Sequence, residues 1–188
     1  IILWKLLKRM NPPEIFELPH LRLRRPAPSD AEAIFEYGSD PAVAHFMDWP
    51  VCTSIDQIRE SLRRRGIRWE SGDEYYWVIT LREADRAIGG ISCYVQPDSA
   101  EIGFLLNRRY WGNGYTTEAA RAVIGWLLSI PGIREVWATC DVENLASARV
   151  LEKAGLSSQG ILDHGIIRPN ISTTPRAAYR YLYQLPIP

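Results

Sequence analysis

The feature that most constrains this chain is a glycine-containing turn at residues 109–114, which reads Arg-Tyr-Trp-Gly-Asn-Gly. The preceding run, 101–106, is short and mostly apolar, which is typical of a buried strand. After the turn, apolar residues recur every three to four positions as far as Leu128 and predict an amphipathic helix. Glycine permits backbone angles and close approaches that a side chain forbids, and the free N–H groups of a helix start attract anions. This unit therefore either binds a phosphate group or simply links a strand to a helix.

Several chemistries lack their sequence signals. No Gly-Lys-Ser/Thr ends the turn, and Gly-x-Gly-x-x-Gly is not matched, so neither a Walker A loop nor a dinucleotide fingerprint is predicted. A Gly-x-Ser-x-Gly nucleophile elbow is also missing from the sequence. The three histidines, His20, His45 and His164, have no metal-ligand spacing. We therefore expect no metal site.

Two motifs together resemble the GNAT superfamily of N-acetyltransferases. The first is Glu-Ile-Gly-Phe at 101–104, followed by Arg-x-x-Gly-x-Gly and by Tyr-x-Thr-Glu-Ala at 115–119. The second is Asn-x-x-Ser-x-x-Val-x-x-Lys-x-Gly-Leu at 144–156, where Leu156 replaces the family's Phe. The chain looks most like the branch of ribosomal-protein N-terminal acetyltransferases, from about Leu21 to Leu185.

The resemblance implies acetyl-CoA as cosubstrate, with its pyrophosphate on the backbone of the glycine turn and its pantetheine along the strand. The implied CoA-binding residues are Phe104, Leu105, Leu106, Arg109, Trp111, Gly112, Asn113, Gly114, Tyr115, Thr116, Asn144 and Ser147. It also implies Glu101 as the base for the amine and Ser147 as the acid for the leaving thiolate. The alternatives are that Glu101 faces solvent, that Asn144 only caps a helix and that Ser147 only faces solvent.

The acceptor pocket is less well defined by the sequence. In the resembled branch, the region 42–49 forms one wall, which makes Phe46, Trp49 and Tyr76 candidate pocket residues. Acidic residues near this wall would favour polycationic amines, and Asp48, Asp73 and Glu74 are available. The alternative is that the aromatic side chains only anchor a loop to the core.

Composition limits the class of protein. The 188 residues are enough for one core, and the 22 basic and 22 acidic residues balance, so we expect no partner among nucleic acids or anionic membranes. Residues 1–20 are interpreted as an N-terminal arm, too short in its apolar part to span a bilayer, and 21–188 as one domain. Three cysteines without a Cys-x-x-Cys pair suggest reduced thiols and a cytoplasmic protein. We expect the protein to be a monomer or a homodimer.

The order of predicted elements indicates an α/β (α+β) fold with a mixed, mostly antiparallel central sheet flanked by helices. Strands are expected at 21–24, 75–81, 87–95, 101–106, 135–140 and 174–185, and helices from Ser29, from Thr53 or Ser54, after Gly114 and after Asn144. In the second helix Ile55, Ile58, Leu62 and Ile67 are predicted to face inward. Its five arginines form either a solvated face or an electropositive rim for CoA or an acidic peptide.

We conclude from the sequence that the protein is an N-acetyltransferase that moves acetyl from acetyl-CoA directly to a primary amine, preferably a protein or peptide N-terminus. Direct transfer fits because no nucleophilic side chain is needed for an acyl-enzyme. Two alternatives stay open: a small amine such as an amino acid, polyamine or aminoglycoside as acceptor, and a CoA-binding module without catalysis.

Overall fold

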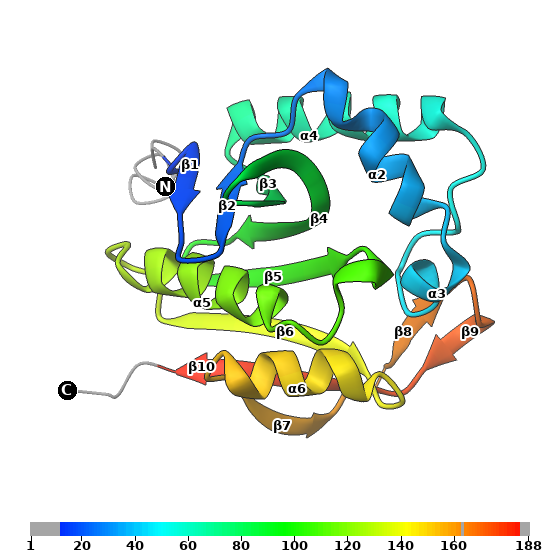
Figure 1. Cartoon of the computed structure of the whole chain (residues 1–188). Helices are drawn as coiled ribbons and strands as arrows, with labels where there is room; N and C mark the ends of the chain where they lie inside the picture. Colours follow the sequence, from blue (N-terminus) through cyan, green and yellow to red (C-terminus); the bar gives the residue numbers. More distant parts are fainter. Residues whose placement is uncertain (1–11, 163, 185–188) are drawn as a thin grey trace.

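The computed structural model describes residues 12–162 and 164–184 (Figure 1). Strands β1 to β7 and β10 belong to one eight-stranded sheet in the order β1-β2-β3-β4-β5-β6-β10-β7, and β8 and β9 form a separate hairpin. The strands are β1 Ile15–Glu17, β2 Leu21–Arg24, β3 Glu74–Leu81, β4 Ala84–Val95, β5 Ser99–Leu106, β6 Glu135–Asp141, β7 Ser157–Ile161, β8 Ile166–Arg168, β9 Ser172–Arg176 and β10 Ala178–Gln184. The helices are η1 Pro28–Asp30, α2 Ala31–Gly38, α3 Pro41–Ala44, α4 Ile55–Ser71, η2 Arg108–Tyr110, α5 Tyr115–Leu128 and α6 Leu145–Lys153.

The large sheet is antiparallel except between β5 and β6, which run parallel. Helices α5 and α6 pack on β5, β6 and β7, while α2 and α4 pack on β3 and β4 (Figure 1). The predicted mixed, mostly antiparallel sheet flanked by helices is therefore confirmed. The sheet lies between two apolar clusters, one centred on α5 and the other on α2 and α4.

The burial of residues in the central strands follows from the alternation of side chains between the two faces of the sheet. In β2, Leu21 and Leu23 are fully buried, whereas the arginines between and after them reach the surface. Strand β3 is buried on both faces, because β2 and β4 flank it and helices cover it. An edge-to-face cluster of Phe16, Trp69, Trp77 and Trp126 then fills one end of the core.

The described part of the predicted N-terminal arm belongs to this sheet. Strand β1 pairs with β2, and the Trp77 indole donates a 2.8 Å hydrogen bond to the Pro13 carbonyl. Residues 1–11, the apolar start of the predicted arm, lie outside the described residues.

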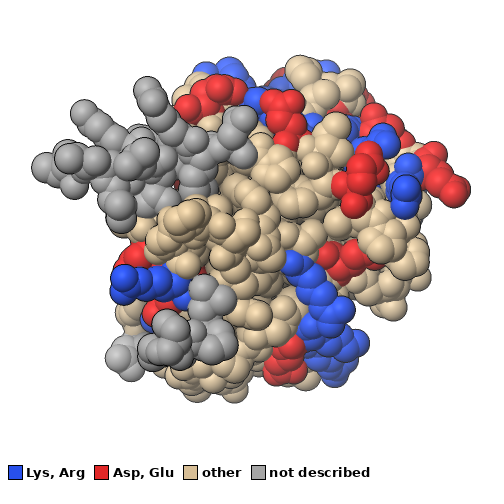
Figure 2. Space-filling view, turned by 90° about the vertical axis from the view of Figure 1, so that its left-hand side faces the viewer, with Lys and Arg blue, Asp and Glu red and all other residues tan. Residues whose placement is uncertain are grey.

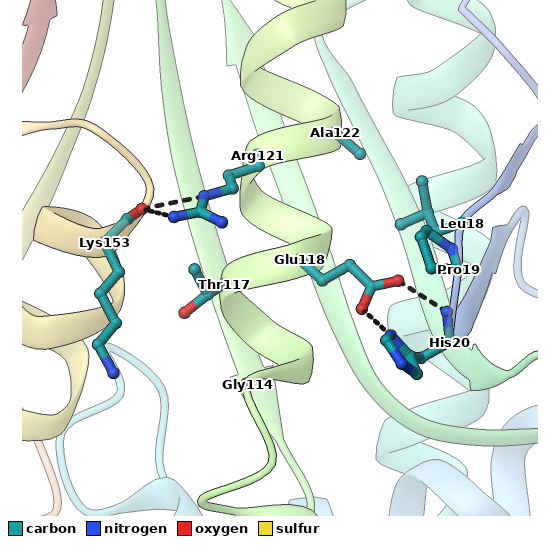
Figure 3. A pocket seen from close by; sticks show the side chains of 9 residues that line it. All are labelled: Leu18, Pro19, His20, Gly114, Thr117, Glu118, Arg121, Ala122 and Lys153. Carbon is teal, nitrogen blue, oxygen red and sulfur yellow. Dashed lines mark hydrogen bonds and ion pairs between the residues drawn. The ribbon is translucent and has the colours of Figure 1, made fainter.

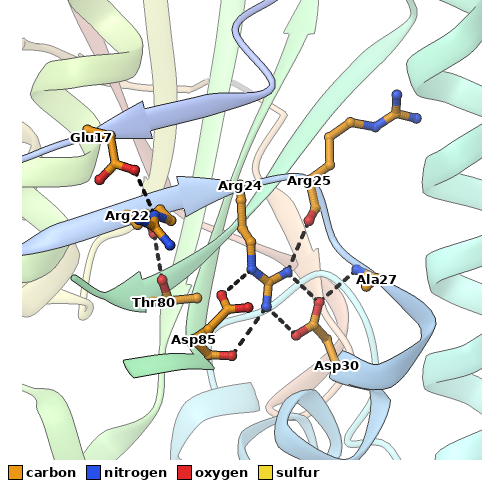
Figure 4. A network of polar contacts seen from close by, with 8 residues as sticks. All are labelled: Glu17, Arg22, Arg24, Arg25, Ala27, Asp30, Thr80 and Asp85. Carbon is orange, nitrogen blue, oxygen red and sulfur yellow. Dashed lines mark hydrogen bonds and ion pairs between the residues drawn. The ribbon is translucent and has the colours of Figure 1, made fainter. Parts of the chain in front are cut away.

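A buried ion pair fixes where α2 begins. The Arg24 guanidinium donates two 2.8 Å hydrogen bonds to Asp30 and one to Asp85, and Asp30 also accepts from the Ala27 amide (Figure 4). These carboxylates raise the pKa of Arg24 above its ordinary value. The prediction that Ser29 caps the helix is wrong, because a 3-10 turn precedes α2 and Asp30 occupies the N-cap.

Helix α4 begins after Ser54, one of the two predicted caps, but its inward face differs from the prediction. Ile58 is buried, whereas Ile67 is exposed and Trp69 takes the inward position near the end of the helix. The arginines of α4 are paired with Asp56, Glu60 and Glu74. Their charge is thus largely neutralised locally, which argues against an electropositive rim.

The C-terminal region contains more strands than the sequence predicted. The strand expected at 174–185 is divided at Ala177 into β9 and β10, of which only β10 joins the large sheet. Strands β1, β7 and β8 were not predicted. Each is five residues or fewer, and none shows the regular alternation of apolar and charged residues that marks β2.

Candidate active site

The centre of the site is the point where β5 and β6 separate. The parallel pairing joins Ser99–Glu101 to Glu135–Trp137, and three residue pairs are all that it contains. Beyond Glu101, β5 continues to Leu106 paired only with β4, and β6 continues to Asp141 paired only with β10. The facing edges of both strands therefore present main-chain groups that the sheet does not use, and a ligand can pair with them.

Alternation along β5 assigns its side chains to opposite faces of the sheet. Ala100, Ile102 and Leu106 belong to the cluster around α5. Glu101 and Leu105 therefore point to the other face, where Leu105 packs against the cluster of α2 and α4. Groups carried by α6 and the carboxylate of Glu101 consequently approach the separation of the strands from opposite sides.

The glycine turn connects the end of β5 to the start of α5. Gly112 and Gly114 have φ values of +82° and +79°, in the left-handed region that favours glycine, and a Cβ at either position would meet no atom within 4 Å. The Trp111 indole donates a 2.8 Å hydrogen bond to the Leu106 carbonyl, and the Asn113 amide donates to two carbonyls of the turn. The turn is thus held by its own side chains and leaves open space over its glycines.

A cleft of about 680 Å³ lies between β5, the glycine turn, α3 and α6. Most of the predicted CoA-binding residues line it: Phe104, Leu105, Leu106, Trp111, Gly112, Gly114, Tyr115, Thr116, Asn144 and Ser147. Arg109 and Asn113 belong to the turn but are not among its lining residues, because Arg109 pairs with Glu36 and Asn113 folds back on the turn. One face of the cleft is formed by α3 and the residues that follow it, including Phe46.

Helix α6 presents Ser147 to this cleft. The Asn144 carboxamide oxygen accepts a 3.1 Å hydrogen bond from the Ser147 amide, which caps the helix and fixes its first turn. The Ser147 side chain lies beside the thiol of Cys140 on β6. Burial raises the pKa of that thiol to about 11, with Ser147 acting against the rise. Cys140 is therefore protonated at neutral pH and is not an activated nucleophile.

Glu101 lies outside the cleft lining, at the last paired residue before the strands separate. Burial raises the pKa of its carboxyl to about 7, Asp48 adds to the rise, and Arg168 opposes it. A carboxyl with a pKa near 7 is suited to proton transfer at neutral pH. The charges that act on Glu101 come from the loop after α3 and from β8, two segments far apart in sequence.

Two of the three predicted acceptor-pocket residues lie away from the cleft. Tyr76 is buried in the cluster of α2 and α4, with the Arg65 guanidinium 3.7 Å from its ring centre. Trp49 is half-buried, and its carbonyl accepts a hydrogen bond from Asn170. Glu74, considered as an acidic pocket residue, is fully buried and pairs with Arg65 and Arg68. Tyr76 lies on the same face of the sheet as Leu105, and a role of Tyr76 or Trp49 at an acceptor pocket stays a prediction.

A second hollow, of about 590 Å³, adjoins the cleft on the outer side of α5. The two share Gly114, Thr117 and Lys153 in their linings. Glu118 accepts 2.9 Å hydrogen bonds from the main chain and ring of His20, and Arg121 donates to the Lys153 carbonyl (Figure 3). These contacts tie the β1–β2 turn and the end of α6 to α5, so the hollow has a fixed shape.

The sequence did not indicate Arg168 or Asn170 as site residues. They lie in the β8–β9 hairpin, which reaches the loop after α3 through hydrogen bonds from Asn170 that span more than a hundred residues of sequence. The available signal was a Pro-Asn pair at 169–170, which indicates a turn and nothing more.

Comparison with known proteins identifies this arrangement. The family model described as an acetyltransferase (GNAT) domain matches residues 20–157. The chain belongs to the GNAT acetyltransferase family. Within the GNAT family, it is 28% identical over 145 residues to the uncharacterized N-acetyltransferase p20 of Bacillus licheniformis, covering 76% of this chain and 82% of that protein. It is 30% identical over 143 residues to the uncharacterized N-acetyltransferase YnaD of Bacillus subtilis, covering 75% and 81%.

Solved GNAT structures share the fold. A GNAT acetyltransferase from Bacillus anthracis has a TM-score of 0.78 at 25% identity, covering 90% of this chain and 98% of that one. The ribosomal L7/L12 N-terminal acetyltransferase RimL, in complex with coenzyme A, has a TM-score of 0.80 at 20% identity, covering 92% and 98%. This GNAT protein is accordingly an acetyl-CoA-dependent N-acetyltransferase, as the sequence motifs predicted.

The surface of this GNAT protein shows no strong field on the face seen in Figure 2. Basic and acidic side chains alternate there around a broad uncharged region, in keeping with the balanced composition. Among the described residues, no helix is both long and apolar enough to cross a membrane, and no cluster of three or more His, Cys, Asp or Glu side chains is arranged to hold a metal ion.

Proposed function

We propose that this enzyme transfers the acetyl group of acetyl-CoA directly to a primary amine, preferably the N-terminal amine of a protein or peptide. The observation that carries the proposal is the separation of β5 and β6 at Glu101. It opens unused main-chain groups toward a cleft lined by Ser147 on one side, and it leaves a carboxyl with a pKa near 7 on the other.

The cosubstrate is held mainly by backbone. The pyrophosphate lies over Gly112 and Gly114, where space is open and the N–H groups at the start of α5 point outward. The pantetheine pairs with the free edge of β5 at Phe104–Leu106, and Asn144 and Ser147 flank it from α6. The nucleotide end extends toward the adjoining hollow beside Lys153.

Each candidate catalytic group has one proton to move. Glu101 takes a proton from the amine, directly or through water, so that the nitrogen can attack the thioester carbonyl. The new C–N bond forms as the C–S bond breaks, and main-chain N–H groups of β5 stabilise the carbonyl oxygen as it becomes negative. Ser147 donates a proton to the departing thiolate and recovers it from solvent. Direct attack is supported by the raised pKa values of Cys52, Cys93 and Cys140, none of which is an activated thiol.

The acceptor class is supported by the fold relatives named above. RimL, the ribosomal L7/L12 N-terminal acetyltransferase, shares its fold with 92% of this chain. A small amine is the second candidate, because the solved self-immunity acetyltransferase MccE, which was captured with acetyl-CoA and AMP, has the same fold with a TM-score of 0.80 at 18% identity.

The decisive experiment measures thiol release from acetyl-CoA across two acceptor panels, one of N-terminal peptides and one of small amines. Turnover confined to peptides supports a protein N-terminal acetyltransferase, and turnover confined to small amines supports the second candidate. Absence of thiol release with both panels, while calorimetry still shows acetyl-CoA binding, would overturn the proposal.

The roles of the two catalytic groups need their own variants. Glu101→Gln and Ser147→Ala should lower kcat by about 10²–10⁴-fold while acetyl-CoA affinity changes little. Glu83→Gln, in the exposed turn between β3 and β4, is the matched control and should leave turnover unchanged. Equal turnover in all three variants would remove these roles.

A further inference from the structure

Arg168 is the one feature near the site that the catalytic scheme leaves without a purpose. Its side chain, on β8, is 93% buried, with 7% of its surface exposed. Its Nε–H is fully enclosed and has no hydrogen-bond acceptor among the described residues. An arginine keeps its charge at any physiological pH, and a buried charge without a hydrogen-bonding partner is costly. Among the described residues, no side-chain hydrogen bond or ion pair holds its two terminal NH2 groups either, and these groups, unlike Nε, are not fully enclosed, so a ligand oxygen can reach them.

Other enclosed arginines of this chain are satisfied by carboxylates. Arg24 makes a bidentate contact with Asp30, Arg65 pairs with Glu74, and Arg176 pairs with Asp141 at 2.8 Å. Asp141, which is close enough to Arg168 to feel its charge, is therefore already engaged by a different guanidinium. Arg168 thus differs from its peers within residues 12–162 and 164–184, where neither an ion pair nor a side-chain hydrogen bond holds it.

The β8–β9 hairpin lies at the open end of β6, because Arg176 on β9 pairs with Asp141 and β10 begins opposite Asp141. Asn170, at the hairpin turn, donates to the carbonyls of Ala44 and Trp49 at 2.6 and 2.9 Å and accepts from the Val51 amide at 3.0 Å. These three bonds fasten the hairpin to the loop that carries Asp48. Asp48 and Arg168 are both close enough to Glu101 to act on its charge, Asp48 as a second carboxylate and Arg168 as a guanidinium.

This set of charges matches a zwitterion. The carboxylates of Glu101 and Asp48 attract an ammonium group, while the terminal N–H groups of the Arg168 guanidinium offer charge-assisted hydrogen bonds to an anionic oxygen. An acceptor with only positive charges would leave the guanidinium unsatisfied and add repulsion. An acceptor with a carboxylate near its amine satisfies every group.

We propose that Arg168 is a specificity-determining residue that binds a carboxylate of the acceptor, so the enzyme acetylates primary amines that carry a carboxylate a few bonds away. This rests on the proposed acetyl transfer to an amine. The chemistry occurs in two sources, a free amino acid and a peptide whose first residue is Asp or Glu.

The test compares acceptors that differ only in that carboxylate. One arm pairs peptides beginning with Asp or Asn on an identical remainder, and the other pairs a free amino acid with its amide. The wild-type enzyme should prefer the carboxylate member of one arm by about 10- to 100-fold in kcat/KM, mainly through KM. The arm that shows the preference identifies the source.

Arg168→Gln should abolish this preference by raising KM for the carboxylate acceptor, with acetyl-CoA affinity unchanged. Arg180→Gln, an exposed arginine on β10 that contacts Glu135, is the matched control and should keep the preference. Equal use of both members of each pair by the wild-type enzyme would overturn the inference even if Arg168→Gln fails to fold. Absence of turnover with every amine would instead count against the proposed function itself.

Discussion

At the residue scale, the proposed role of Glu101 as the base connects pH to activity. Its pKa is raised to about 7 by burial and by Asp48, and the base must be ionised to accept a proton. We expect kcat/KM to rise with pH and to level off above a midpoint near 7. Asp48→Asn removes a like charge, so the midpoint should move to lower pH, and the shift should shrink in high salt because Asp48 is exposed. A pH profile that is unchanged in Asp48→Asn would contradict this electrostatic link.

The same carboxyl has a cost in stability. A carboxyl whose folded pKa is raised from 4.5 to about 7 is fully compatible with the fold below pH 4.5 and destabilises it increasingly as pH rises toward 7. The full penalty at pH 8 is roughly 3 kcal/mol. Glu101→Gln should therefore unfold at higher denaturant concentration than the wild type at pH 8 and at a similar one near pH 4.5. Equal stability of the two proteins at pH 8 would show that the fold does not raise the pKa of the Glu101 carboxyl.

Gly112 tests whether the glycine turn binds the cosubstrate. Valine there must adopt a left-handed φ, which costs about 1–2 kcal/mol, and its side chain enters the open space where the pyrophosphate is proposed to lie. Gly160→Val is a matched control, because Gly160 also has a positive φ and open surroundings but lies in β7, away from the cleft. Calorimetry should show acetyl-CoA affinity reduced at least about tenfold in Gly112→Val and unchanged in Gly160→Val. Similar affinities in both would make the turn purely structural.

At the element scale, we propose that the β8–β9 hairpin forms the acceptor side and α5 the cosubstrate side. Asn170→Ala removes three hydrogen bonds, one to the end of α3 and two to the loop after it, so it should lower the free energy of unfolding by about 1–3 kcal/mol and raise KM for the acceptor. Asn113→Ala removes two bonds within the glycine turn and should instead weaken acetyl-CoA binding. Denaturant unfolding and separate KM values for the two substrates distinguish the variants. If both variants altered both KM values alike, the two sides of the site would not be independent.

Elements differ in how far the sequence predicts them. Strand β5, the glycine turn and α5 are contiguous, so their pattern is local and the cosubstrate side could be predicted before the fold was known. The acceptor side could be predicted only in part, because Glu101 and Asp48 were named from the sequence, whereas Arg168 comes near them only through the pairing of distant segments. Tyr76 was assigned to the pocket by its neighbourhood in sequence, yet alternation along β3 directs it into the core under α2 and α4. Alternation along a strand shows which side chains share a face of the sheet, but it does not show which face binds a ligand.

At the scale of the whole molecule, the separated strands predict how acetyl-CoA changes stability. The sheet is continuous everywhere except beyond the three β5–β6 pairs, so its two halves are held together at one end by backbone pairing and elsewhere by α5 and α6. A ligand that pairs with the free edge of β5 and contacts α6 bridges the halves. At a concentration 100 times its Kd, it should stabilise the folded state by about 2.7 kcal/mol.

Hydrogen exchange locates that stabilisation. Amides of 104–106, 112–117 and 144–147 should gain protection beyond the global increase, because they contact the ligand or become enclosed by it, whereas β1 to β3 should follow the global increase alone. The acceptor-side hairpin provides an internal comparison. Since β8 and β9 contribute no residue to the lining of the cleft, acetyl-CoA should not protect them locally, but an acceptor bound with non-hydrolysable acetyl-CoA should. Local protection of the hairpin by acetyl-CoA alone would mean that both substrates bind on one side of the sheet. That result would contradict the proposal that the alternation along β5 places the cosubstrate and the acceptor on opposite sides.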